Sequence, residues 1–104
     1  MSNTYFVSFT LDDGEHGRRS YSTRWQDLYD AIRGLSDTYW EQTAAFIAFK
    51  TTADISQIVS AVRGAISPEY DIVLIRSMDS KIARILGPVT DPDIFAIMPY
   101  LKKA

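Results

Sequence analysis

Hydrophobic residues along this chain follow two spacings, and the two spacings alternate. Residues 4–11 place apolar side chains at every second position, which is typical of a strand with one buried face. Two later segments place them at three- and four-residue intervals, which is typical of a helix packed through one side. The elements expected in order are a strand at 4–11, a helix at 23–35, strand-forming residues at 38–51, a helix at 54–66, and strands at 71–78 and 81–86. The order β-α-ββ-α-β predicts an α+β fold, a ferredoxin-like βαββαβ sandwich.

Both expected helices begin with residues that favour a helix start. Thr23 and Gln26, three residues apart, predict a capping box for the first helix. Asp54 and Gln57 predict the same arrangement for the second helix. Pro68 cannot continue the second helix, because proline lacks the backbone N–H that a helix interior needs.

The segment 38–51 is rich in aromatic residues and admits two interpretations. It forms either a pair of strands or one long bent strand with a bulge near Gln42 and Thr43, because no Asn-Gly or Asp-Gly marks a tight turn. Tyr39 and Trp40 point to opposite faces if the segment is extended, so we expect one of them to be exposed or to meet a partner.

The C-terminal third is expected to complete the sheet and to add one helix. Residues 71–78 are apolar enough for a central strand, whereas residues 81–86 carry charges that suit an edge strand. Asp91 as the N-cap and Pro92 at the first helical position predict a short helix that ends near Met98. The prediction is an antiparallel sheet with two helices on one face plus a short C-terminal helix.

The second face of this sheet predicts self-association. Phe6 shares that face with Ser8 and Thr10, so the face is neither fully apolar nor fully polar. Because the face and the edge strand both need cover, we expect a homodimer.

Composition narrows the class of protein. At 104 residues the chain suits one domain over residues 1–104. The absence of cysteine excludes disulfides, thiolate zinc sites and cysteine nucleophiles, and fits a reducing compartment. No apolar run approaches the roughly 18–20 residues that span a bilayer, and no signal peptide is evident. We therefore expect a cytoplasmic protein that does not enter a membrane.

These patterns also resemble a known group of proteins. The chain is similar, over residues 4–86, to the SinR-like group of small bacterial proteins. That group is similar in turn to the ferredoxin-like CRISPR-associated adaptation subunit and to the virulence-associated VapD ribonucleases. The resemblance rests on the segments YFVSFTL, LYDAI, TYWEQTAAFIAF, the pattern T-x-x-D-I-S-Q-I, and DIVLI. It implies a βαββαβ fold and a homodimer joined through sheet edges.

The same resemblance bears on catalysis. In the CRISPR-associated family an Asp within an aromatic-Asp-hydrophobic triplet, near the end of strand one, holds a metal ion at the dimer seam. The matching triplet here is Phe9-Thr10-Leu11, so the carboxylate is absent from the matching position. Threonine cannot supply the anionic oxygen that Mg²⁺ favours.

The polar loop after the first strand holds the other candidate chemistry. Asp12 and Asp13, with Glu15, could form a displaced Mg²⁺ site if carboxylates from two subunits activated water against a phosphodiester. The alternative is a solvated acidic loop with Asp-Gly turn chemistry. His16, the only histidine, suits a general base near neutral pH, or is an ordinary surface residue.

Arg18, Arg19 and Arg24 are the candidate contacts to nucleic acid. They cluster in one segment, and phosphate binding needs concentrated positive charge. The net charge of −2 argues against a basic surface over the whole molecule. A solvated loop with ordinary surface charge is the alternative interpretation.

Three functions remain open at this stage. The first is an uncharacterised SinR-like protein that acts by self-association and by binding a nucleic acid or a protein partner. The second is a metal-dependent endonuclease that uses Asp12 or Asp13, for which Mg²⁺ would be the cofactor. The third is a small-molecule-binding regulatory domain. No serine triad, GxGxxG or phosphate-binding Gly-Lys motif is present, so whether the protein is an enzyme stays open.

Overall fold

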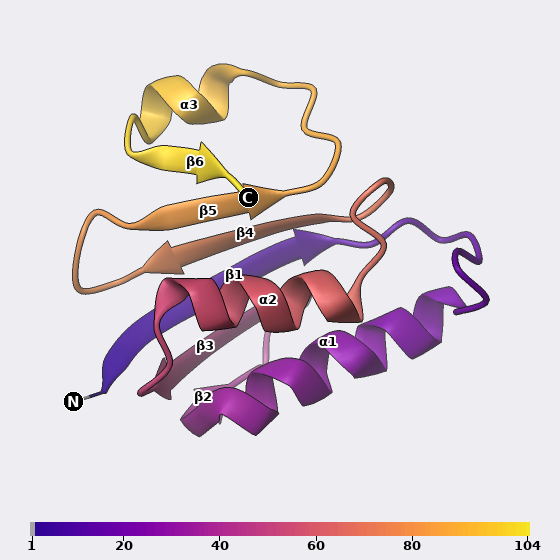
Figure 1. The fold of residues 1–104 in the computed structure, drawn as a ribbon, viewed down its shortest axis with the longest axis horizontal. Coiled ribbons are helices and arrows are strands. Elements are labelled where there is room, and N and C mark those ends of the chain that lie inside the picture. Colours follow the sequence, from indigo (N-terminus) through magenta and orange to yellow (C-terminus); the bar gives the residue numbers. More distant parts are fainter. Residues whose placement is uncertain (1) are drawn as a thin grey trace.

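The computed structural model of the protein describes residues 2–104 and contains one six-stranded sheet with helices on both faces (Figure 1). The elements in chain order are β1 (Asn3–Thr10), α1 (Tyr21–Leu35), β2 (Ser36–Trp40), β3 (Phe46–Thr51), α2 (Ile55–Ala65), β4 (Ile72–Ser77), β5 (Ala83–Leu86), α3 (Asp93–Ile97) and β6 (Leu101–Lys103). The strand order is β2-β3-β1-β4-β5-β6, and every neighbouring pair is antiparallel except β5 with β6. The predicted α+β class and its ferredoxin-like core are therefore confirmed. The expected domain bounds include residue 1, which lies outside the described residues.

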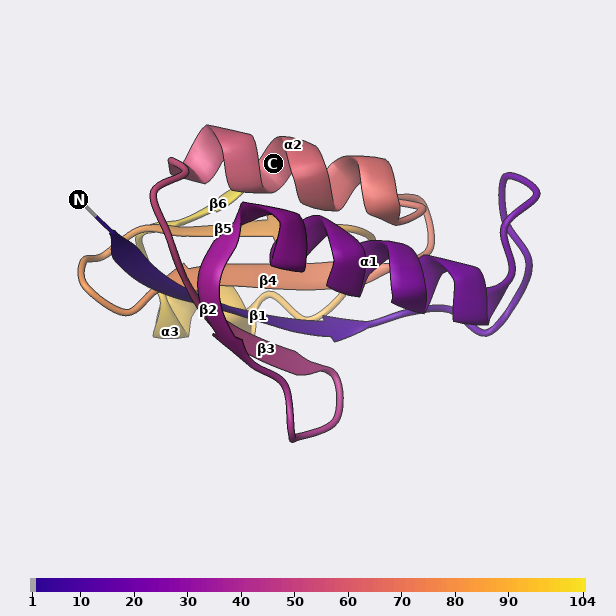
Figure 2. The same cartoon turned by 90° about the horizontal axis from the view of Figure 1, so that it is seen from below.

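The main core lies between the sheet and helices α1 and α2, which lie side by side on one face (Figure 2). Val7 of β1 pairs with Ile47 of β3 and Ile75 of β4, and all three side chains are fully buried. Ile32 of α1 and Ile58 of α2 are also fully buried in this cluster. Each such side chain stabilises the fold by about 1.5–3 kcal/mol, so the two helical stripes fix which face of the sheet is covered.

A second, smaller core lies on the opposite face. Helix α3 covers only the end of the sheet formed by β4, β5 and β6 (Figure 2). Ala83, Ile85 and Leu101 are buried there, and Ile94 and Phe95 of α3 pack against them. Among residues 2–104, no helix lies over the part of this face formed by β2, β3 and β1.

Of the two capping boxes predicted for the long helices, the structure contains one. The capping box of Asp54 and Gln57 is confirmed: each side chain accepts a hydrogen bond from the other's backbone N–H, at 2.9 and 2.8 Å. The capping box at Thr23 is wrong. Ser20 is the N-cap, and its hydroxyl accepts from the backbone N–H of Thr23 at 3.1 Å, so α1 begins at Tyr21.

The segment 38–51 forms two strands, as the first interpretation predicted. β2 and β3 are joined by residues 41–45, and the register irregularity lies between Ser36 and Thr38 rather than near Gln42. Tyr39 lies opposite Phe49, which is buried toward the helices, and so Trp40 is on the other face. Both side chains are nearly half exposed.

Two predictions for the C-terminus are wrong. β5 is not an edge strand, because β6 pairs with it and buries Leu101 against α3. Pro92 is the N-cap of α3 rather than its first residue, and the carboxylate of Asp91 accepts from the N–H of Asp93 at 2.9 Å. Among residues 2–104, none of the helices combines the length and the apolarity that crossing a bilayer requires.

Candidate functional site

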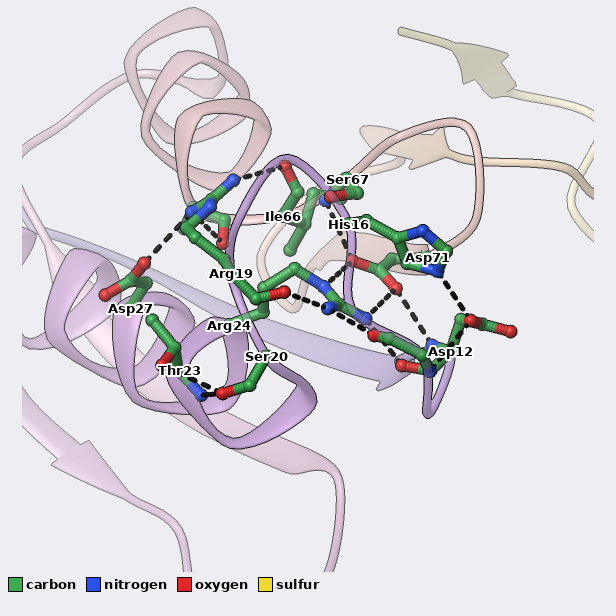
Figure 3. Close-up of polar contacts among 12 residues, drawn as sticks. Asp12, His16, Arg19, Ser20, Thr23, Arg24, Asp27, Ile66, Ser67 and Asp71 are labelled. Atoms are coloured by element: carbon green, nitrogen blue, oxygen red, sulfur yellow. Dashed lines mark hydrogen bonds and ion pairs between the residues drawn. The ribbon is translucent and has the colours of Figure 1, made fainter.

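Four of the predicted site residues lie where the loop after β1 packs against the turn between α2 and β4: Asp12, His16, Arg19 and Arg24 (Figure 3). The two segments are more than 45 residues apart in sequence. An ion pair between Arg24 of α1 and Asp71, which precedes β4, joins them, and both side chains have no exposed surface.

Arg24 uses all of its side-chain donors inside the protein. Its Nε donates to Asp71 Oδ2 at 2.9 Å, and one Nη2 hydrogen bond reaches Asp71 Oδ1 at 3.2 Å. The remaining donors reach three backbone carbonyls, those of Asp12 (2.5 Å), Gly14 (2.8 Å) and Arg19 (3.1 Å). The five N–H groups of a guanidinium are thus satisfied.

Asp71 is satisfied to the same degree. Besides Arg24, its carboxylate accepts from the backbone N–H of Asp12 at 2.9 Å and from that of Ser67 at 2.8 Å. A buried charge pair is tolerated only with such complete hydrogen bonding. We conclude that this pair holds the two loops in place and is not available to a ligand.

Asp12 and His16 form a second contact at the rim of this cluster. His16 Nε2 lies 2.6 Å from Asp12 Oδ2, and the backbone N–H of Gly14 donates to the same oxygen at 3.0 Å. These hydrogen bonds, the one from His16 above all, lower the pKa of Asp12 below its usual value. The His16 ring also stacks on Tyr70 with centroids 3.6 Å apart and planes 6° apart.

The predicted carboxylate metal site does not assemble within one chain. Asp12 is committed to His16 and Gly14, while Asp13 and Glu15 are exposed. In the part of the chain that the structure describes, no three His, Asp or Glu side chains converge to hold a metal ion. The Mg²⁺-dependent nuclease stays a prediction, and it would need groups from a second copy.

The predicted surface of three arginines is not formed. Arg24 is buried, so its assignment to nucleic-acid binding is wrong. Arg19 donates to the carbonyls of Ala65 and Ile66 at 2.9 and 3.1 Å, and so caps the C-terminus of α2. Of the three, Arg18 is exposed. The positions of the charges in the sequence do not reveal these roles, because the partner of Arg24, Asp71, and the partner of Arg19, the end of α2, are distant in sequence and meet them only in the folded chain.

A second candidate surface, which we call the open half-face, contains none of the predicted charged site residues. We define it as the part of the sheet not covered by any helix, with Phe6 of β1, Trp40 of β2 and Phe46 of β3 at its centre. Phe6 and Phe46 stack with ring centroids 5.3 Å apart, and Trp40 meets Phe46 edge-on at 6.2 Å. Trp40 is 44% exposed. The alternation of Phe6 with Ser8 and Thr10 was the signal for this face.

The acid behaviour of Asp12 gives a testable prediction. Because its pKa is lower in the folded state, Asp12 stabilises the fold above the unfolded value of 3.8, and this contribution is lost as the pH falls through the folded pKa. The Asp12→Asn variant is therefore expected to melt below the native protein at pH 7, with a difference that shrinks below pH 3.8. Thermal unfolding followed by circular dichroism measures this. Asp13→Asn is the control, and an equal loss at pH 7 in the control would contradict the assignment.

No family model matches this chain, and searches of curated proteins and of solved structures found no match either.

Proposed function

We propose that this protein is a small binding protein that takes single-stranded nucleic acid on the open half-face and associates with a second copy through the free edge of β2. The observation that carries the proposal is the row of aromatic side chains, Phe6, Phe46 and Trp40, on three adjacent strands. The apolar core does not need these rings, since the helices cover the other face. Phe6 and Phe46 are half-buried and Trp40 is 44% exposed, and a partly exposed apolar patch of this kind supports an interaction surface.

Aromatic rings on a sheet suit unpaired bases. Every base has a flat π-face, so stacking on Phe or Trp is worth about 1–3 kcal/mol per base and tolerates any sequence. Neighbouring strands lie about 4.8 Å apart, which puts rings on adjacent strands within reach of consecutive bases. Four-stranded RNA-binding sheets of βαββαβ type stack two or three bases in this way; this support is an analogy of fold.

The open half-face has few positive charges around it, so charge is expected to contribute little to binding. Lys50 of β3 shares the face, because it pairs with Thr4 and Thr38 on the neighbouring strands. Arg76 borders it, held over the Tyr100 ring at 4.9 Å. One or two phosphate contacts imply a dependence of log K on log salt of only about −0.7 to −1.4 for single strands. Stacking, rather than charge, would dominate.

The free edge of β2 supports self-association. β2 pairs only with β3, so one side of its backbone has no strand partner within the described chain. At the opposite edge of the sheet, Lys102 and Lys103 of β6 provide charges that discourage strand pairing. A second copy placed on β2 would continue the sheet and leave Trp40 accessible on its face.

The test uses two adjacent residues with opposite orientations. Binding of a fluorescein-labelled oligouridylate, about ten nucleotides long to cover one single-strand site, is measured by anisotropy for the native protein, Trp40→Ala and Tyr39→Ala. Trp40→Ala should weaken binding by about 5- to 150-fold, from the 1–3 kcal/mol of one stacked base. Tyr39→Ala is the matched control, because it is similarly exposed on the opposite face, and should leave the Kd nearly unchanged.

Other outcomes would overturn the proposal. If no oligonucleotide binds, and light scattering shows that Trp40→Ala converts a dimer to a monomer, the open half-face is a protein interface. If the oligonucleotide is cleaved in Mg²⁺ and Asp12→Ala or Asp13→Ala abolishes cleavage, the nuclease is correct instead.

A further inference from the structure

A second surface, the α2–β5 groove, lies on the helical side of the sheet. It has a volume of about 300 Å³ and is lined by Ile55, Ser56, Val59, Ser60, Arg63, Arg84 and Ala104. Five of these residues come from α2, where the spacing 55, 56, 59, 60 and 63 defines one side of the helix. The groove exists because β5 and β6 extend the sheet beyond its ferredoxin-like core of four strands.

The sheet register places a cation on the side of the groove that β5 forms. Arg84 of β5 lies opposite Ile75, whose side chain is buried under the helices, so Arg84 points to the helical side. Lys102 of β6 pairs with Arg84 and shares that side. Arg63 reaches the same groove from the last turn of α2. Two arginines thus line the groove, and Lys102 lies on the same side of the sheet, in a protein whose net charge is −2.

The two arginines have few partners of their own. Within residues 2–104 neither Arg63 nor Arg84 forms an ion pair, and the side chain of Arg84 donates to a single backbone carbonyl, that of Ala83, at 2.9 Å. No Asp or Glu of the described chain lines the groove, and Ala104, which lines it and carries the terminal carboxylate, forms no ion pair with either arginine. This contrasts with Arg19, Arg24 and Arg33, each of which pairs with a carboxylate.

We propose that the α2–β5 groove binds a phosphomonoester that carries an apolar or aromatic group, of the size of a nucleoside monophosphate. Arg63 and Arg84 hold the phosphate through charge-assisted hydrogen bonds, which guanidinium groups form in pairs. The hydroxyls of Ser56 and Ser60 donate to further phosphate oxygens. Ile55 and Val59 provide the apolar floor for the rest of the ligand. The groove lies on the opposite face from the open half-face, so this site does not depend on the proposed function.

The test measures binding of adenosine 5′-monophosphate by calorimetry, with adenosine and inorganic phosphate as separate probes. We expect saturable binding of the monophosphate with a Kd between about 10 μM and 1 mM, and shifts of the Ser56, Ser60 and Arg84 amide signals in NMR spectra. Adenosine and inorganic phosphate should each bind more weakly by about tenfold or more, the factor that corresponds to roughly 1.4 kcal/mol. Arg63→Gln and Arg84→Gln should each weaken binding about tenfold, as the loss of one charge-assisted hydrogen bond would.

Arg18→Gln is the matched control, since Arg18 is exposed in the loop after β1 and does not line the groove. The proposal is wrong if no probe saturates, if adenosine binds as well as its monophosphate, or if Arg18→Gln weakens binding as much as Arg84→Gln. Equal affinity for inorganic phosphate and the monophosphate would overturn the role of the apolar floor. Both groove substitutions are on exposed or half-buried side chains, so the variants should fold.

Discussion

Replacing Arg24 by alanine is expected to lower the free energy of unfolding by about 3–5 kcal/mol, the range for breaking a buried ion pair. The side chain has no exposed surface and makes five hydrogen bonds. Its removal leaves the Asp71 carboxylate buried with an uncompensated charge and takes one hydrogen bond from each of three carbonyls, of which that of Arg19 keeps the N–H of His16 as a donor. A small domain has only about 5–15 kcal/mol of net stability, so this single change removes a large share of it.

Urea denaturation followed by circular dichroism measures the effect. Arg24→Lys is the variant to use if Arg24→Ala does not fold: it keeps the positive charge, but three donors cannot replace five, so an intermediate loss is expected. Arg18→Ala is the control and should stay within about 0.5 kcal/mol, as exposed substitutions do.

A double-mutant cycle assigns the effect to the pair. Because Arg24 and Asp71 are partners, Arg24→Ala with Asp71→Ala should cost less than the sum of the two single variants. Additive losses would mean that the two residues act independently, and would contradict the role of the ion pair. A loss below about 1 kcal/mol for Arg24→Ala, the net value of one ordinary hydrogen bond, would do the same.

The sequence predicts those parts of the fold in which the spacing of apolar residues alone determines which side of a strand or helix is buried. Alternation at Val7 and Phe9 identifies the central strand, and the stripe through Ile58 and Val62 identifies the buried side of α2. These features are local, and burial follows them directly. β6 is not predicted, because a strand of three residues is too short to show an alternation of apolar and polar side chains. Leu101 is buried by contacts with α3 that form only in the complete fold.

The candidate site is less predictable because it depends on distance through space. The arginines at 18, 19 and 24 look alike in sequence, yet one is exposed, one caps α2 and one is buried. Arg24 also occupies the helical stripe, four residues before Leu28, which is a position where a buried arginine needs a carboxylate partner. Nothing near it in sequence identifies Asp71 as that partner.

The second large effect is expected at Gly87, which follows β5. Its φ of +104° is in the region that side chains rarely adopt, and a Cβ at this position would lie 1.9 Å from the carbonyl oxygen of Asp71 and 2.9 Å from the Cα of Ile72. Both atoms belong to the backbone at the start of β4, so they cannot rotate away. Gly87→Ala is therefore expected to cost about 2–5 kcal/mol, from backbone strain and overpacking together.

Alanine variants at two other glycines distinguish the effect of backbone strain from that of overpacking. Gly17 has a φ of +59°, and a Cβ added there would have no atom within 4 Å, so Gly17→Ala should show the strain alone, about 1 kcal/mol. Gly34 is helical with open space around it, so Gly34→Ala should stabilise the protein by about 0.5–1 kcal/mol. Urea denaturation of the three variants should give the order Gly34→Ala, Gly17→Ala, Gly87→Ala from most to least stable.

The position of Gly87 connects this prediction to the ion pair. An alanine there would displace the backbone of Asp71, whose carboxylate holds Arg24 and the N–H groups of Asp12 and Ser67. We therefore expect Gly87→Ala to increase hydrogen exchange at the amides of Asp12 and Ser67, which lie in two different loops. If Gly87→Ala instead matches Gly17→Ala in stability and leaves both amides protected, the contact with Asp71 does not constrain the fold, and Gly87 is required for its φ alone.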